Sequence, residues 1–204
     1  MTEKLTSVQN PRIKRVVKLR QRRQRERERS FLIEGYRELT RAIEGAFPIS
    51  ELYHCPEMYL GDNEPALVAA IAASGAECFE VAPVVFEKIA YRDRPEGLLG
   101  VAPTADWGLD RIDVSGSPLL IVATSIEKPG NLGTILRCAD AAGARGVIVC
   151  DRVTDIFNPN VVRASIGNLF TVPIAEAETA ELLSWLRTHQ IRSVATSPDA
   201  TLCY

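Results

Sequence analysis

Asn131 and Arg137 are the residues whose types and spacing best fit chemistry on an anionic substrate. Asn131 can donate and accept hydrogen bonds, and it stands where an apolar strand pattern gives way to a helix pattern. Arg137 follows six residues later among mostly apolar neighbours. A charged side chain is unusual in such a setting unless it has a partner or a function. An arginine on a solvated helix face is the alternative interpretation, and the residues alone leave both open.

A strand, a turn and a helix must position these two residues. The apolar run Leu119–Ala123 predicts a strand that is covered on both faces. Glu127–Gly133 predicts a turn, and the apolar spacing over Ile135–Ala142 predicts a helix that Gly143 ends. Backbone N–H groups and the helix dipole meet at such a helix entrance and favour anions. Roughly half of such turns merely connect a strand to a helix, and this one is neither a Walker loop nor the dinucleotide fingerprint.

Residues 1–30 are strongly basic in a chain whose formal net charge is −2. Eleven Lys and Arg residues against three Glu residues give this segment a charge of +8, so the remainder carries −10. Apolar residues at helical spacing after Asn10-Pro11 predict a basic helix, which we interpret as an arm for RNA phosphates. A solvated helix, a membrane surface and a partner protein are the alternatives. Because arginine suits bidentate phosphate contacts, the candidate RNA-binding residues are Arg20, Arg22, Arg23 and Arg25.

From residue 31 onward, strand and helix patterns alternate, which predicts an α/β fold. Residues 31–102 are expected to form a small α/β sandwich, and residues 103–116 a linker in which Trp107 packs locally. The expected strands are Phe31–Glu34, Ile49–His54, Cys78–Val81 and Leu98–Ala102, and the expected helices are Tyr36–Ala46, Glu64–Ser74 and Val84–Ala90.

Residues 117–204 are expected to form a second unit with a parallel sheet and right-handed crossovers. Asn158-Pro159 is a helix-start signal, and Arg163 with Ser165 on that helix would meet phosphate or ribose. A capped helix with an exposed arginine is the alternative. The further expected strands are Val147–Cys150, Phe170–Ile174 and Ile191–Thr196, and the further helices are Pro159–Ile166 and Thr179–Thr188.

The composition, with 46% hydrophobic and 25% charged residues, is ordinary for a globular protein. No apolar run approaches the roughly 20 residues of a membrane span, and the charged start predicts no secretory signal. Five cysteines without Cys-x-x-Cys spacing, accompanied by two histidines, predict neither a metal site nor a disulfide framework. We therefore expect a cytoplasmic protein.

The segment Asn131–Arg137 resembles the first motif, Asn-x-Gly-x-x-x-Arg, of the SPOUT superfamily of RNA methyltransferases, in its TrmH or SpoU branch of 2'-O-ribose methylating enzymes. The resemblance covers most of the chain in the family's order. The other segments that carry it are Phe31–Gly35, Pro95–Val101, Asn158-Pro159 and Arg163–Gly167.

The resemblance implies an S-adenosylmethionine-dependent RNA 2'-O-ribose methyltransferase that acts on rRNA or tRNA as a homodimer. It also implies a ribosomal-protein-like RNA-binding domain followed by a SPOUT-type parallel α/β domain. Arg137 inherits the proton-handling step at the ribose hydroxyl, and Asn131 inherits contact with the ribose or with Arg137. Glu34 would border the RNA, although a capping role is an equally simple interpretation, and Thr196 would border the cofactor.

Two further motifs of the family should follow the last strand and form the trefoil knot that holds S-adenosylmethionine. The chain reaches Tyr204 before either. We therefore expect residues 1–204 to bind RNA without methylating it. A non-catalytic module that binds structured RNA is the alternative function, and a nucleotide-dependent oxidoreductase is disfavoured by the absent glycine fingerprint.

Overall fold

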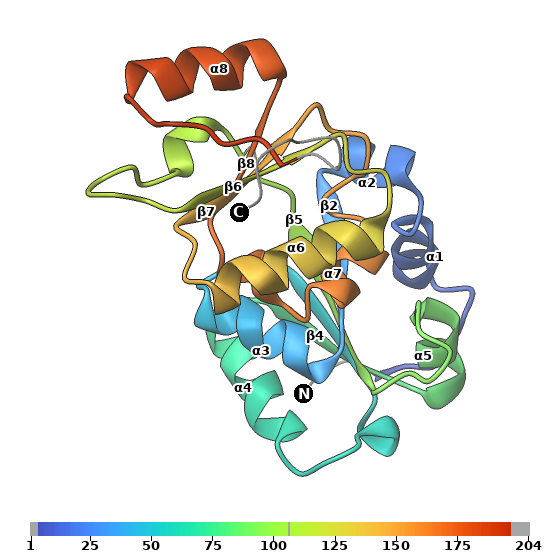
Figure 1. The fold of residues 1–204 in the computed structure, drawn as a ribbon. Coiled ribbons are helices and arrows are strands. Elements are labelled where there is room, and N and C mark those ends of the chain that lie inside the picture. Colours follow the sequence, from blue (N-terminus) through green and yellow to red (C-terminus); the bar gives the residue numbers. More distant parts are fainter. Residues whose placement is uncertain (1–3, 106, 197–204) are drawn as a thin grey trace.

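Two sheets organise the chain in a computed structural model that describes residues 4–105 and 107–196 (Figure 1). The first sheet is mixed and has the strand order β1-β4-β3-β5-β2, and the second is parallel with the order β6-β7-β8. The first sheet contains β1 (Lys4–Leu5), β2 (Ser30–Glu34), β3 (Glu51–His54), β4 (Glu77–Val81) and β5 (Leu98–Pro103). The second contains β6 (Leu120–Thr124), β7 (Gly146–Cys150) and β8 (Ile174–Ala177).

Successive side chains along β2 point to opposite faces of the first sheet, and a hydrophobic core covers each face. Phe31 and Ile33 belong to the core under α3 and α4, whereas Leu32 belongs to the core under α1 and α5. The result is a sheet between two helical layers, and the predicted α/β sandwich is confirmed. The helices of this unit are α1 (Pro11–Lys18), α2 (Arg22–Glu28), α3 (Tyr36–Glu44), α4 (Glu64–Ala73) and α5 (Pro83–Ile89).

The basic N-terminal segment, which we interpreted as an arm, packs against the first sheet over the described residues. β1 pairs in parallel with β4, and the side chains of Ile13, Val16 and Leu19 are fully buried beside α5. The helix start at Asn10 is confirmed, because its side chain accepts a hydrogen bond from the backbone N of Arg12 at 2.8 Å. The short apolar stripe is thus buried in the core of the first unit. The segment forms two helices, α1 and α2, where the sequence predicted one.

The central strand β7 divides the second unit in the same way. Val147 and Val149 face the core that contains α6, whereas Ile148 and Cys150 face the core that contains α8. β6 pairs only with β7 among the described strands, and 41% of Val122 is exposed, so the expected coverage of both strand faces is wrong. The helices of this unit are α6 (Pro129–Ala141), α7 (Pro159–Ala164) and α8 (Thr179–Thr188).

Two of the expected strands of the second unit differ from the structure. Residues 191–196 form no strand, because none of the described strands pairs with them. Residues 168–170 form a 3-10 turn, and β8 begins only at Ile174. Phe170 and Val172 are buried in the core shared with α3, so their apolar character reflects packing rather than strand pairing.

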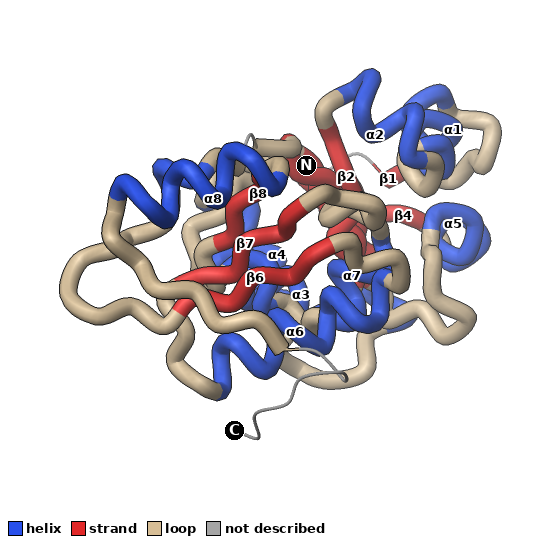
Figure 2. The backbone as a smooth tube through the Cα atoms, turned by 45° about the horizontal axis from the view of Figure 1, so that its top comes forward, coloured by secondary structure: helices blue, strands red, loops and turns tan. Residues whose placement is uncertain are grey.

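Aromatic packing joins the two units across the linker. The ring of Phe157 lies 4.7 Å from that of Phe31 and 4.9 Å from that of Trp107, between ring centroids. Trp107 therefore contacts the second unit and does not only pack locally. One continuous core runs from α3 to α6 and α7, which places helices of both units beside each other (Figure 2).

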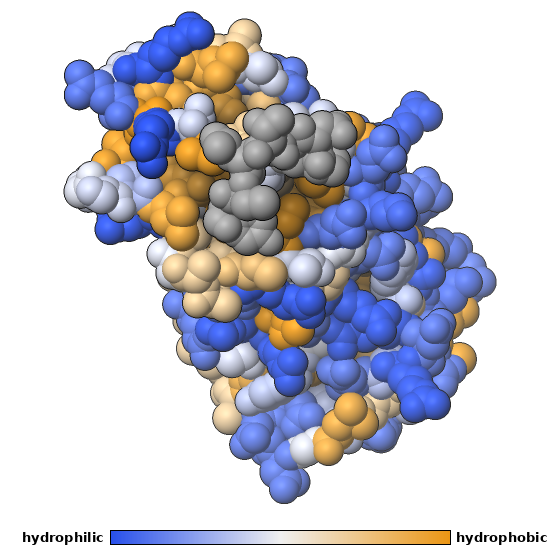
Figure 3. All heavy atoms as spheres, viewed as in Figure 1, coloured by the Kyte–Doolittle hydropathy of each residue, from blue (hydrophilic) through white to orange (hydrophobic). Residues whose placement is uncertain are grey.

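Apolar side chains also reach the surface of the second unit. Figure 3 shows hydrophobic side chains gathered around α8 and β6, while the surface of the first unit in this view is mainly hydrophilic. Leu119 and Leu183 are 55% and 43% exposed. No described helix is both long and apolar enough to cross a membrane.

Candidate active site

Helix α6 begins at Pro129, so the turn predicted for Glu127–Gly133 is wrong from Pro129 onward. Proline suits the first helical position, because its φ is already helical and its missing N–H would have no partner there. The backbone N of Asn131 donates to the carbonyl of Lys128 at 3.0 Å. Asn131 and Gly133 therefore belong to the helix and not to a loop before it.

Gly133 allows α6 to approach α7 closely. A Cβ at this position would lie 2.4 Å from the Cβ of Ala164 and 2.8 Å from the backbone N of Ser165. Neither contact is compatible with a larger side chain unless the helices move apart. The glycine of the motif thus fixes the spacing of the two helices that carry Arg137 and Arg163.

A shallow groove lies between these helices, and we call it the α6–α7 groove. Its walls consist of Pro129, Gly130, Arg137, Asn160, Arg163, Ala164 and Ile166. Arg137 is exposed, and its only hydrogen bond to a described residue joins Nη2 to Thr134 Oγ1 at 3.4 Å. Arg163 is exposed and has no hydrogen bond or ion pair with any described residue. Two guanidinium groups with free donors make the groove suitable for phosphate.

Asn131 and Ser165 do not line the α6–α7 groove. Asn131 is exposed on the first turn of α6, and a spacing of six residues places its side chain about 120° around the helix from that of Arg137. Ser165 is fully buried, and its Oγ donates to the carbonyl of Val162 at 2.8 Å. Ser165 therefore supports the end of α7 and does not face a ligand.

Two family models match this chain over nearly its whole length. The MRM3-like substrate binding domain matches residues 10–100, and the SpoU rRNA Methylase family matches residues 118–204. A solved RNA 2'-O ribose methyltransferase is 37% identical with a TM-score of 0.80, and the match covers 97% of this chain and 74% of that one. The chain belongs to the SpoU rRNA methylase family.

Other members of the SpoU family agree in sequence and fold. An AdoMet-bound rRNA methyltransferase from Sinorhizobium meliloti is 32% identical with a TM-score of 0.82, over 92% of this chain and 69% of that one. A 23S rRNA (uridine(2479)-2'-O)-methyltransferase from Streptomyces viridochromogenes is 31% identical over 168 residues, which is 81% of this chain. The chain spans 57% of the length of that relative. The family and fold that the sequence predicted are confirmed.

Arg25 of this SpoU-family chain is buried between the two units, although the sequence nominated it for RNA. It is 3% exposed, and its Nε and Nη2 donate to Asp155 Oδ2 at 3.0 and 2.5 Å. Its Nη1 donates to the carbonyls of Leu19 and Arg20. Asp155 in turn accepts from the backbone N of Phe157 at 2.9 Å. This ion pair, which we call the Arg25–Asp155 contact, holds α2 against the loop that leads into α7.

The other nominated arginines lie near the surface in different settings. Arg20 donates through Nη2 to the carbonyls of Lys88 and Ala90, so it holds the end of α5. Arg22 pairs with Glu26 on its own helix at 2.8 Å. Arg23 is exposed and has no partner among the described residues. Of the four, Arg23 is the arginine most available to a phosphate.

Glu34 is buried and holds a loop in place. It is 8% exposed, and its Oε2 accepts from the backbone N atoms of Tyr91 and Arg92 at 2.7 and 3.2 Å. Burial raises the pKa of Glu34, although these N–H donors oppose the change. The structure therefore places Glu34 as a support for the loop after α5, whose Tyr91 Oη accepts from Asn160 Nδ2 at 2.9 Å.

Thr196 is exposed and lies in an irregular segment, not in a strand. We selected Thr196 because we expected it at the end of a strand over Ile191–Thr196, and these residues do not form a strand. Asn160 was missed in the sequence, where it follows Asn158-Pro159 and could have been singled out as a polar residue on the same short helix. Arg92, whose guanidinium bonds Glu34, Glu38 and Glu96, carried no recognisable signal in its loop.

Proposed function

We propose that this chain acts in the S-adenosylmethionine-dependent methylation of ribose 2'-hydroxyls in rRNA or tRNA. The α6–α7 groove carries the proposal, because Arg137 of the Asn131–Arg137 motif and Arg163 present free guanidinium donors there. SpoU-family relatives support it, since their names describe 2'-O-methylation of uridine and guanosine in 23S rRNA.

Arg137 is the proposed catalytic residue on the acceptor side. A ribose 2'-hydroxyl is barely acidic, so it must be placed in line with the methyl donor, and its developing negative charge must be stabilised. A guanidinium stays protonated at neutral pH. We therefore assign to Arg137 the binding of the neighbouring phosphate and the stabilisation of the developing oxyanion.

Asn131 is proposed to contact the ribose itself at the entrance of α6. Its amide offers both a donor and an acceptor, which suits a ribose hydroxyl. Because Asn131 and Arg137 lie on different faces of the helix, Asn131 does not orient Arg137 within one chain. Arg163 is proposed to hold a second phosphate of the same RNA strand.

S-adenosylmethionine is the proposed cofactor, and when bound it supplies the methyl group from its sulfonium. The related enzyme from Sinorhizobium meliloti carries AdoMet. In this chain the one nominated cofactor residue, Thr196, is exposed, and the strand on which its nomination rested does not form. We assign no described residue to the cofactor.

A non-catalytic role in binding structured RNA is the second candidate function, since free guanidinium groups serve binding and catalysis alike. Transfer of labelled methyl groups from S-adenosylmethionine to rRNA or tRNA separates the two, and resistance of the modified linkage to alkaline hydrolysis identifies the 2'-O position. Methyl transfer would support the enzyme, and RNA binding without detectable transfer would support the binding module. Calorimetric titration with S-adenosylmethionine checks cofactor binding independently.

We also propose that the protein is a cytoplasmic homodimer. The exposed apolar side chains around β6 and α8, Leu119 and Val122 among them, favour association with a second copy. Cys55, Cys78, Cys138 and Cys150 are free, which fits a reducing compartment. Light scattering over a range of concentrations tests the dimer, and a strict monomer would count against it.

A further inference from the structure

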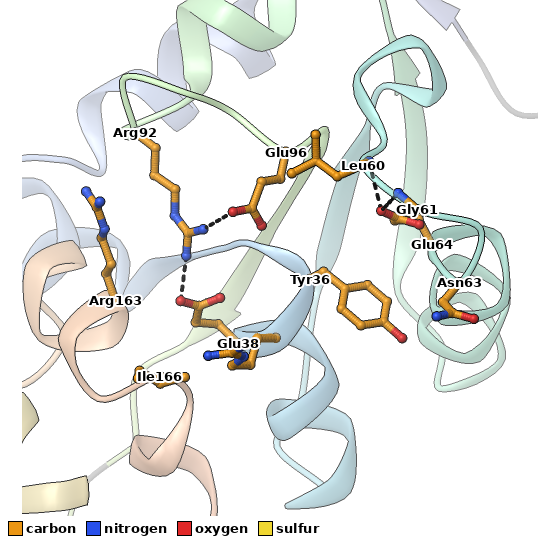
Figure 4. Close-up of a pocket in the computed structure, with 11 residues that line it drawn as sticks. Tyr36, Glu38, Leu60, Gly61, Asn63, Glu64, Arg92, Glu96, Arg163 and Ile166 are labelled. Carbon is orange, nitrogen blue, oxygen red and sulfur yellow. Dashed lines mark hydrogen bonds and ion pairs between the residues drawn. The ribbon is translucent and has the colours of Figure 1, made fainter.

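A second hollow shares part of its wall with the α6–α7 groove, and we call it the interdomain pocket. Figure 4 shows how it lies between the start of α3, the segment before α4, the loop after α5 and the end of α7. Arg163 and Ile166 line both hollows. The pocket measures about 540 Å³, within the range of about 300–1,000 Å³ that is usual for small-ligand sites. A strand that lies in the groove can therefore continue directly into the pocket.

Arg92 forms a rigid part of this pocket. Its Nη2 donates to Glu38 Oε1 at 2.5 Å and its Nη1 to Glu96 Oε1 at 2.7 Å (Figure 4). Nη2 also donates to the carbonyl of Glu34 at 2.9 Å. Glu38 is 4% exposed, so this network is largely removed from water. Both terminal nitrogens of Arg92 are thus bound to the protein, while its buried Nε has no partner among the described residues. Other side chains on the pocket wall are more accessible to a ligand.

Glu64 is a buried carboxylate with an unused acceptor. The residue is 5% exposed, and its Oε1 accepts from the backbone N atoms of Leu60 and Gly61 at 3.0 and 2.9 Å. Its Oε2 is buried and has no hydrogen-bond partner among the described residues. Burial opposes ionisation, yet the backbone N–H donors hold the pKa of Glu64 below its ordinary value. An unsatisfied buried acceptor is costly, so a donor from a ligand would stabilise this site.

Two other groups on the pocket wall are available. Tyr36 is partly exposed, and Figure 4 shows its ring between the Glu38–Arg92 pair and the segment that carries Glu64. Arg163 brings a guanidinium group without a partner among the described residues. An aromatic face, a cation and a carboxylate acceptor are the groups that recognise, respectively, a base, a phosphate and an amino group.

On the basis of the proposed function, we propose that the interdomain pocket binds one unpaired nucleotide of the substrate RNA, next to the ribose at Arg137. Its base stacks on Tyr36, and its exocyclic amino group donates to Glu64 Oε2. Arg163 binds the phosphate between this nucleotide and the one in the groove. The site favours cytosine, adenine and guanine over uracil, because uracil presents carbonyl oxygens where the others carry an amino group.

The test is equilibrium binding of fluorescently labelled hexacytidylate and hexauridylate to residues 1–204, followed by anisotropy without cofactor. Cytosine carries an amino group at the base edge that Glu64 would contact, where uracil carries a carbonyl oxygen. We expect hexacytidylate to bind about tenfold more tightly, as for a hydrogen bond to a charged group. Tyr36→Ala should weaken both probes by about fivefold to a hundredfold, whereas the control Tyr36→Phe retains the stacking face and wild-type affinity.

Glu64→Gln tests the amino contact, because it keeps an amide oxygen for Leu60 and Gly61. Its amide nitrogen is a donor where the carboxylate was an acceptor, so the preference for cytidine should vanish or reverse in favour of uridine. Thermal unfolding of each variant verifies that it is folded. Equal affinity of the wild type for both probes, or discrimination that survives Glu64→Gln, would overturn the proposal. Free CMP that binds as tightly as hexacytidylate would also overturn it, because the site would then serve a mononucleotide.

This experiment is separable from the methyl-transfer assay. Loss of the cytidine preference in Glu64→Gln, without any detectable methyl transfer by the protein, would refute the proposed function and support the pocket. Methyl transfer without discrimination between the two probes would support the function and refute the pocket.

Discussion

The Arg25–Asp155 contact and the α6–α7 groove use the same side chain in opposite ways. Arg25 is 3% exposed, and three of its nitrogens donate to one carboxylate and two carbonyls. Arg137 and Arg163 are exposed, and neither has an ion pair with a described residue. The first arginine joins two units, whereas the other two offer donors to a ligand.

This difference shows that the partner of an arginine, and not its place in a basic run, decides its role. Burial removes a guanidinium from water at a high cost, and a matched carboxylate must compensate for it. An arginine on an open groove keeps its hydration and loses it only when an anion binds. The two regions are coupled, because the Arg25–Asp155 contact fixes the loop that leads into α7 and thereby positions Arg163.

Arg25→Ala should have the largest effect. It leaves Asp155 buried without its counter-charge, which is expected to lower the free energy of unfolding by about 3–5 kcal/mol. Urea unfolding followed by circular dichroism measures this change. Arg23→Ala on the same helix is the matched control and should stay within about 0.5 kcal/mol of the wild type. Equal stability of the two variants would refute a structural role for Arg25.

Arg137→Ala should lower methyl transfer in an active preparation of the protein by about a hundredfold or more, as for the loss of an oxyanion-stabilising donor. RNA affinity should change by only a few-fold, because the contact acts chiefly in the transition state. Initial rates with labelled S-adenosylmethionine and filter binding of RNA give the two quantities. Full activity of the variant would exclude Arg137 from catalysis.

Gly133→Ala should disturb the spacing of α6 and α7. The new Cβ would lie 2.4 Å from the Cβ of Ala164, and we expect a loss of about 1–3 kcal/mol from overpacking. Gly130→Ala is the control, because a Cβ there meets no atom within 4 Å. If Gly133→Ala is as stable as the control, the close packing of the two helices does not determine the groove.

Replacing Arg23 and Arg27 together by Ala should flatten the salt dependence of RNA binding. Both are exposed and without a partner among the described residues. The slope of log affinity against log salt should fall by about one for each phosphate that the variant no longer binds. Arg22→Ala and Arg25→Ala should change the slope less. An unchanged slope in the double variant would place the RNA elsewhere on the surface.

The pH dependence of stability should reveal the burial of Glu34, and this effect is the smallest. Burial raises its pKa above the ordinary value of 4.5, so the folded state binds the proton more readily than the unfolded chain. The stability of the wild type relative to Glu34→Gln should therefore rise as the pH falls from 7 to 4.5. Unfolding curves at several pH values test this direction. The opposite trend would mean that the N–H donors outweigh burial.

Much of the architecture could be read from the sequence, because each element carries its own local pattern. Tyr36–Glu44 and Thr179–Thr188 have helical spacing, and Asn158 caps α7 as its position before Pro159 predicts. Asn131 and Arg137 were recognised by their fixed spacing in a motif. Such signals are confined to a few consecutive residues, so they survive without knowledge of the rest of the chain.

Only the tertiary structure decided which side chains are free. Arg23 and Arg25 are two residues apart in one basic run, yet only Arg25 meets a carboxylate, from Asp155, which lies 130 positions further along the chain. Ser165 is buried while Arg163 on the same helix is exposed, because α7 packs one face against α6. Composition and spacing determine the kinds of groups that a chain can present. Their burial and their partners depend on contacts between distant segments, which no local pattern encodes.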